Sequence, residues 1–310
     1  MCIEKINLKK VLRISGNILV IISIIFLFTK VVNMDIDYKD VFSVDNVVRL
    51  IPILILYTLQ VLLSYIPWQM IITCMIEKSV PSTQVCCVFA KANIMKYIPG
   101  NIFQYVGRAE LAQLNSDVNI TLIATSVIIE TIATALAAIL VGIVGATEYT
   151  ISLLRENKSI CLLIVIFIVV VFLIVLVLKD RIREFLGKKN VVINGRLVFW
   201  LLIAVIFYMG MLIFDGIMLT YIMQVISGQN YFKQVQIICG AFAISWVAGY
   251  IMPGASGGVG IREAILFMLL GNSVEMEAVI LATLILRFVN ILADLQAYGI
   301  TLLMKKLWKK

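Results

Sequence analysis

Two apolar segments are joined by the stretch Tyr250-Ile251-Met252-Pro253-Gly254-Ala255-Ser256-Gly257-Gly258-Val259-Gly260-Ile261-Arg262-Glu263. Pro253 removes a backbone donor and, with Gly254, ends the incoming helix. Three more glycines permit positive φ and close backbone approach: Gly257, Gly258 and Gly260. In a bilayer, irregular backbone survives only where protein or a watery cavity satisfies it. Arg262 and Glu263 open the next helix, and charges at such a depth indicate a functional site.

An earlier stretch has the same design. Pro99 and Gly100 break one apolar segment, and Arg108 and Glu110 lie on the segment that follows. In both stretches the arginine falls nine residues after the proline. We interpret the two as an internal repeat and predict two re-entrant helical hairpins, over about residues 84–114 and 234–271.

The composition places the chain in a membrane. Its 310 residues are 62% hydrophobic and 14% charged, whereas soluble domains are about half apolar and a quarter charged. The apolar runs are continuous rather than alternating, which disfavours a β-barrel. We therefore predict an all-α polytopic membrane protein, with residues 1–310 forming a single integral membrane domain.

Six apolar runs are long enough to cross a bilayer completely. They cover about Ile14–Val32, Val47–Ile76, Thr121–Gly145, Ser159–Leu178, Leu197–Ile226 and Ala278–Met304. Pro52 and Pro67 predict kinks in the second of these spans. The fold prediction is thus six full transmembrane helices and two re-entrant hairpins.

The distribution of charge predicts the orientation. With the N-terminus inside, the cytoplasmic segments hold 15 Lys or Arg against 5 Asp or Glu, and the outer loops hold 5 against 8. This bias agrees with the positive-inside rule and predicts a cell-membrane protein with both termini in the cytoplasm. Three full spans separate the hairpins, so we expect the hairpins to enter from opposite faces, as in transporters whose binding site lies at the midplane.

Eleven charged residues fall within apolar segments. They are Lys30, Lys91, Lys96, Arg108, Arg262, Arg287, Glu110, Glu130, Asp215, Glu263 and Asp294. Each central charge costs about 2.5–3.5 kcal/mol to insert, so the set indicates function or pairing rather than chance. Lys30 lies close enough to a helix end to reach the interface.

The two hairpin arginines are the candidate ligand-binding residues. Arg262, at a helix N-terminus, suits a phosphate because the free N–H groups, the dipole and the guanidinium all favour an anion. Arg108 lies deeper on its arm and is expected to serve the other leaflet, so we predict two basic, glycine-lined pockets. The alternative is structural: Arg108–Glu110 and Arg262–Glu263 would pin the hairpins. Adjacent helical residues do not face each other, so Glu263 is expected to pair elsewhere, for instance with Arg287.

The remaining buried charges have open roles. Glu130 and Asp215 are single mid-span carboxylates that could relay a proton or bind a cationic headgroup, and partnership with Lys91 or Lys96 is the favoured alternative. On the last span, four residues share one inward helical face: Arg287, Ile291, Asp294 and Tyr298. Arg287 is expected either to touch a headgroup or to neutralise Glu263.

Several classes of chemistry are disfavoured. The chain has no histidine, and its six cysteines lack C-x-x-C spacing, so we predict no metal site, no cofactor and no disulfide. It has no phosphate-binding G-x-x-x-x-G-K-[ST] motif, and its glycine-rich stretch lies between membrane helices rather than after a strand. We assign no catalytic residues and expect no nucleic-acid partner.

The chain resembles the lysylphosphatidylglycerol synthase transmembrane-region family, the flippase-like half of the multiple-peptide-resistance factors. The resemblance spans about residues 10–305 and rests on the residues of both hairpins and two later positions. These are Lys96-Tyr97-Ile98-Pro99-Gly100, Gly107-Arg108-Ala109, Glu130, Pro253-Gly254, Gly257-Gly258-Val259-Gly260-Ile261-Arg262-Glu263, Arg287 and Asn290. Many relatives carry arginine after the mid-span glutamate, where this chain has Thr131.

This resemblance implies a flippase for an anionic or aminoacylated phospholipid such as lysylphosphatidylglycerol, with a link to antibiotic resistance. The expected headgroup-binding residues are Lys96, Arg108, Gly257, Gly258, Gly260, Arg262, Glu263 and Arg287. The longest predicted cytoplasmic loop, residues 179–196, is too short to fold the aminoacyl-transfer domain of the full-length relatives. We therefore expect that domain to be missing.

Two other functions stay open. The chain could be a lipid-modifying transferase of the phosphatidylglycerol lysyltransferase type, or an accessory protein for polyprenyl-phosphate glycolipid and envelope-glycan assembly. A separate synthase or glycosyltransferase is the expected protein partner in these cases. The oligomeric state stays open between a monomer and the homodimer that the resemblance suggests.

Overall fold

The chain is helical throughout its described part. The computed structural model describes residues 43–76, 78–97, 103–115, 118–145, 195–251, 260–271 and 273–307. Their elements are α3 (Val44–Leu63), α4 (Tyr65–Ile76), α5 (Ser82–Ile94), η1 (Met95–Tyr97), α6 (Phe103–Arg108), α7 (Glu110–Leu114), α8 (Ile120–Gly145), α11 (Gly195–Ser227), η2 (Phe232–Gln234), α12 (Val235–Ile251), α13 (Ile261–Leu270) and α14 (Met276–Leu307).

Within the described residues, five helical segments are long and apolar enough to cross a membrane. They are Val44–Ile76, Ile120–Gly145, Arg196–Ser227, Phe232–Tyr250 and Met276–Lys305. Four of them coincide with predicted full spans. The other two predicted full spans, Ile14–Val32 and Ser159–Leu178, lie outside the described residues.

The fifth segment differs from the prediction. The sequence pattern makes Phe232–Tyr250 the incoming arm of a re-entrant hairpin, whereas α12 is by length and composition a candidate for a full span. In the first predicted hairpin, α5, η1, α6 and α7 are all shorter than a span, and α5 packs against α6. The breaking residues of both hairpins lie outside the described residues: Pro99, Gly100, Pro253, Gly254, Gly257 and Gly258.

Local signals explain where the helices begin and break. The Ser43 hydroxyl accepts the N–H of Asn46 at the start of α3, and the side-chain Oδ1 of Asn119 accepts the N–H of Leu122 at the start of α8. The second span is interrupted at Ser64, between α3 and α4. Pro67 explains the break because its ring excludes the carbonyl four residues earlier. By contrast, α3 continues through Pro52.

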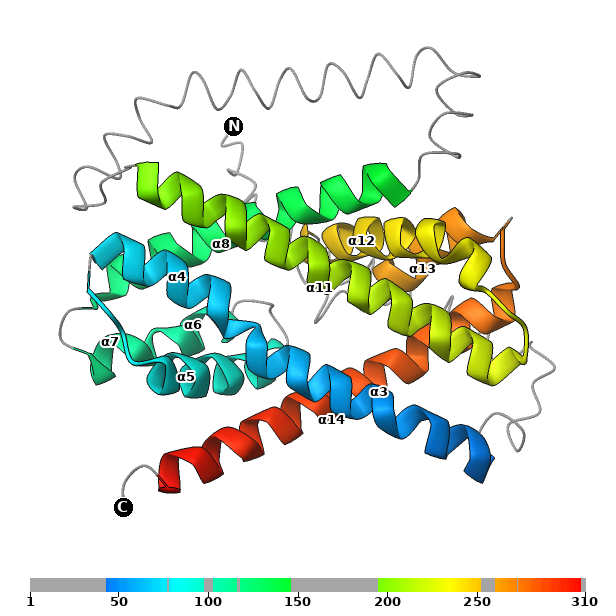
Figure 1. Cartoon of the computed structure of the whole chain (residues 1–310), viewed down its shortest axis with the longest axis horizontal. Coiled ribbons are helices and arrows are strands. Elements are labelled where there is room, and N and C mark those ends of the chain that lie inside the picture. Colours follow the sequence, from blue (N-terminus) through cyan, green and yellow to red (C-terminus); the bar gives the residue numbers. More distant parts are fainter. Residues whose placement is uncertain are drawn as a thin grey trace, which may run out of the picture.

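The helices pack as a bundle whose outer surface is apolar. Figure 1 shows α3 crossing α14 and α5, α6 and α7 grouped beside α4, while α12 packs against both α8 and α13. Large aliphatic side chains remain exposed along the spans, for example Ile55 on α3, Ile128 on α8 and Ile206 on α11. Exposed apolar surface on this scale is typical of contact with lipid rather than water.

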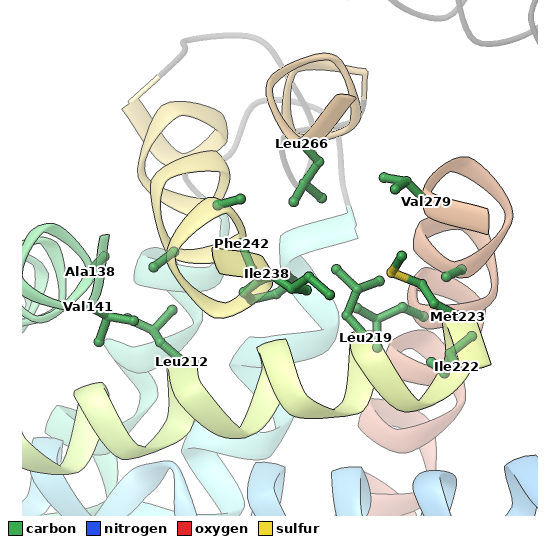
Figure 2. Packing of buried hydrophobic residues seen from close by; sticks show 14 of the residues in the cluster. Ala138, Val141, Leu212, Leu219, Ile222, Met223, Ile238, Phe242, Leu266 and Val279 are labelled. Carbon is green, nitrogen blue, oxygen red and sulfur yellow. The ribbon is translucent and has the colours of Figure 1, made fainter. Parts of the chain in front are cut away.

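The main apolar core joins α3, α8, α11, α12, α13 and α14. Figure 2 shows Leu212 and Leu219 of α11 packed toward Ile238 and Phe242 of α12. A second core lies around Trp68 and joins α4, α5, α7 and the first half of α8. These two cores hold the helices that surround the site described next.

Candidate functional site

A polar cavity of about 540 Å³ lies inside the bundle and is partly open to the exterior. Its wall is built from all five candidate spans and from the shorter helical segments α5, η1, α6 and α13. The lining residues are Tyr57, Gln60, Val61, Ser64, Phe89, Asn93, Lys96, Tyr97, Gln104, Tyr105, Arg108, Glu130, Thr131, Thr134, Tyr208, Met211, Leu212, Asp215, Phe242, Trp246, Gly249, Tyr250, Arg262, Arg287, Asn290 and Ile291. Four of the six predicted headgroup-binding residues with described positions line it: Lys96, Arg108, Arg262 and Arg287.

Arg108 is buried and neutralised. Only 6% of the residue is exposed, and its guanidinium lies over the rings of Trp68 and Phe89, with centroid distances of 4.8 and 4.5 Å. It donates to the carboxylate of Glu130, which also accepts the hydroxyl of Tyr208 at 2.8 Å. Arg108 is therefore committed to α8 and to the aromatic rings around it.

Two further cations on the cavity wall also have carboxylate partners. Lys96 lies 2.6 Å from Asp294, whose same oxygen accepts the hydroxyl of Tyr97 at 2.6 Å. Arg287 donates to Glu263, as the sequence predicted. These pairs join η1 and α13 to the last span, α14.

Glu263 also organises the start of α13. Its second carboxylate oxygen accepts the N–H of Gly260 at 2.7 Å, which satisfies one of the free donors of the first helical turn. Gly260 has φ +85°, a conformation that side chains other than glycine's rarely adopt. The glycine and the glutamate together set the direction in which α13, and so Arg262, leaves the turn.

Arg262 differs from the other three cations. It forms no ion pair with any residue in the described part of the chain. Its buried Nε has no hydrogen-bond partner there, but the same is true of the Arg108 Nε, so the missing counter-charge is what sets Arg262 apart. Its guanidinium lies 5.6 Å from the ring centroid of Trp246, which stacks on Tyr250 at 5.0 Å. Buried donors without partners are rare in folded proteins and need an explanation. A bound anion would supply one.

The backbone of α12 is shaped to accept Arg262. Gly249 lies directly under this side chain: a Cβ atom at Gly249 would come within 2.6 Å of the Arg262 Cγ and 2.8 Å of its Nε. Glycine at this position lets the arginine lie flat against the helix beside Trp246. Neither Gly249 nor Trp246 was a predicted site residue. The signal was nonetheless present, because Trp246 and Tyr250 are four residues apart and share a helical face.

The two hairpin segments meet at one cavity. The hydroxyls of Tyr105 on α6 and Tyr250 on α12 contact each other, and Thr131 on α8 lies 3.0 Å from the Tyr250 hydroxyl. Arg108 and Arg262 therefore share a single cavity instead of lining the two separate pockets that the sequence predicted.

The predicted partners of the mid-span carboxylates are wrong. Glu130 pairs with Arg108 rather than with a lysine, and Asp215 accepts the side-chain amide of Gln60 at 2.9 Å. Lys91 instead pairs with Glu110 at 2.6 Å, on a partly exposed side of the first hairpin away from the cavity wall. The short helices α6 and α7 pack against α8, and that contact decides the pairing of Arg108 with Glu130.

Within the part of the chain that the structure describes, no group of His, Cys, Asp and Glu residues has the arrangement of a metal site. The cavity thus offers cationic donors, tyrosine hydroxyls and aromatic faces, a set suited to binding an anion. Together the fold and the site define a helical membrane protein with a charged internal cavity. No family model, curated protein or solved structure matches the chain.

Proposed function

We propose that this protein binds the anionic headgroup of a membrane phospholipid in the cavity and moves that lipid between the two leaflets. The observation that carries the proposal is Arg262, a half-buried arginine with a buried Nε and no ion pair among the described residues, whose guanidinium lies on Trp246 at the cavity wall. A charge without a counter-charge is costly in a site of low dielectric constant. Two oxygens of one phosphate can accept two parallel N–H donors of an arginine guanidinium.

The surrounding residues support a headgroup rather than a bare ion. A cavity of about 540 Å³ exceeds the needs of a single small anion, and Lys96 and Arg287 lie on its wall beside polar Asn290. These two cations are already paired, so they would add hydrogen bonds and steer the phosphate without leaving uncompensated charge. The sequence resemblance favours phosphatidylglycerol or its lysyl ester as the lipid. The polyprenyl-phosphate glycolipids have the same anionic group and are the alternative.

Arg262→Ala is expected to reduce lipid translocation at least about tenfold, because truncating the partner of a desolvated charge costs about 2–5 kcal/mol of binding. The measurement is the rate at which fluorescent phosphatidylglycerol in proteoliposomes becomes accessible to an external quencher. Arg262→Lys should recover only part of the rate, since an ammonium cannot bind a phosphate bidentately.

Arg49→Ala is the matched control. Arg49 is an exposed arginine on α3 that pairs with Asp45 at 2.7 Å, far from the cavity wall. Its replacement should leave translocation unchanged. Equal rates for wild type and Arg262→Ala would contradict the proposal. Lipid binding that depends on Arg262 without any translocation by the wild type would favour the accessory-protein alternative.

A further inference from the structure

Among the described residues on the cavity wall, one cation and one carboxylate have no ion pair. Three pairs are formed between the wall and its neighbours: Arg108–Glu130, Lys96–Asp294 and Arg287–Glu263. Arg262 and Asp215 remain, and both line the same cavity. Within the described residues, Asp215 has an uncharged partner, the Gln60 amide, on one carboxylate oxygen. Among the described residues of the wall, Arg262 is thus the one cation left to offset the charge of Asp215.

Among the described residues, the surroundings of Asp215 contain no second cation that lacks a carboxylate partner. Asp215 is flanked by Tyr57 and Gln60 of α3, Cys239 of α12, Lys96 of η1 and Arg262 of α13. Lys96 is held by Asp294. On the remaining neighbours of α11, Glu130 of α8 and Arg287 of α14 are already paired, and α4 places none of its ionisable side chains on the wall.

Binding an anion changes this balance. A phosphodiester carries one negative charge, so its binding at Arg262 would leave Asp215 as uncompensated charge in a site of low dielectric constant. Buried charge of that kind is expensive, and an ionisable group responds by becoming neutral. For a carboxylate, neutralisation means the uptake of a proton.

We propose that the binding of one phosphodiester anion at Arg262 is coupled to the uptake of one proton by Asp215. The proton adds to the carboxylate oxygen that the Gln60 amide does not hold, and the loaded cavity is then electroneutral. This inference rests on the proposed function, because it takes Arg262 to be the anion site. It identifies the proton as the coupling ion for lipid movement.

The sign of the pH dependence follows from this linkage. Protonated Asp215 favours the anion and ionised Asp215 opposes it, so affinity is high at low pH. Above the pKa of the carboxylate, affinity should fall about tenfold for each unit of pH. Phosphodiesters stay singly charged through this range, so the ligand itself contributes no proton.

The test is calorimetric titration of the purified full chain in detergent with a short-chain phosphatidylglycerol. At one pH, buffers of different ionisation enthalpy reveal how many protons are taken up for each lipid bound. Wild type is expected to take up about one proton above the pKa of Asp215. Asp215→Asn should take up none, and should bind at high pH as tightly as wild type does at low pH. Glu277→Gln, which removes an exposed carboxylate in the first turn of α14, is the matched control and should behave like wild type.

The outcomes separate the two proposals. No binding by wild type at any pH, or binding that Arg262→Ala does not change, overturns the proposed function. Binding that needs Arg262 but shows no proton uptake by wild type overturns the coupling, as does affinity that follows sodium concentration at fixed pH. The number of protons taken up by the wild type is measured without any variant. The coupling can therefore be tested even if the Asp215→Asn protein does not fold.

A second ligand distinguishes a lipid from a free phosphodiester. Dimethyl phosphate carries the same charge without acyl chains, so it should bind with the same proton count but much more weakly than the lipid. Equal affinity for the two ligands would overturn the assignment to a lipid headgroup.

Discussion

Glu130→Ala is expected to lower the free energy of unfolding by about 3–5 kcal/mol, because it leaves a buried arginine without its counter-charge. Arg108 and Glu130 are 6% and 7% exposed. The guanidinium lies over the rings of Trp68 and Phe89, and these contacts hold it beside Glu130. The variant also removes the acceptor of the Tyr208 hydroxyl. Unfolding by a denaturing detergent in mixed micelles, followed by far-UV circular dichroism, measures the change.

The exposed pair Asp45–Arg49 supplies the control. Its side chains are 72% and 56% exposed, so Asp45→Ala should cost no more than about 1 kcal/mol. Replacing both members of the buried pair, as Arg108→Met with Glu130→Leu, should recover most of the loss, since neither charge is then left alone. A Glu130→Ala protein as stable as Asp45→Ala would show that Arg108 has another counter-charge.

The second large effect is expected at Gly216. This glycine of α11 lies against the backbone of α12: a Cβ atom there would approach the Cα and the Sγ of Cys239 to 2.6 Å. The backbone cannot move aside as a flexible side chain can, so Gly216→Ala must push the two helices apart. We expect a loss of about 1–3 kcal/mol in unfolding free energy, the usual cost of overpacking a core.

Gly210 lies on the same helix and provides the comparison. A Cβ atom at Gly210 would meet nothing within 4 Å. Gly210→Ala should therefore stabilise the protein by about 0.5–1 kcal/mol, because alanine loses less conformational freedom in a helix. The same unfolding assay compares both variants. Equal stability of the two would mean that α11 and α12 are not in backbone contact.

The spans were predictable because hydropathy and length decide them. Four predicted spans match helices of the structure within a few residues. The incoming arm of the second hairpin was harder to predict. Its length of 19 residues, Phe232–Tyr250, lies between the length expected of a re-entrant arm and that of a full transmembrane span. The proline and glycine that follow mark where the helix ends, but they carry no information on how deeply it is inserted.

The charge pairs show what sequence can and cannot determine. Glu263 was correctly paired with Arg287, since adjacent helical residues face different directions and Arg262 was thereby excluded. The partner of Glu130 was missed, because pairing there depends on the docking of α6 against α8. The spacing of residues along separate helices does not reveal that contact.

The aromatic rings beneath the arginines were missed for a related reason. Trp68, Phe89 and Trp246 come from three different helices, and each is unremarkable in an apolar segment. Only the folded bundle places guanidinium groups over them. The arginines themselves were predictable, because charge within apolar sequence is costly and therefore rarely incidental.

The division of α8 between two apolar cores has a consequence for how the bundle can open. Ile123 and Val127 belong to the smaller core, Ala133 and Val141 to the larger one, and Glu130 lies between them. On α8 the junction between the two cores is occupied by the Arg108–Glu130 ion pair, and a small third cluster around Ile71 and Leu197 joins α4 to α11 beside it. A local opening there would have to break this ion pair and the third cluster, but it would leave the interior of each core intact and widen the cavity to whose wall both cores contribute.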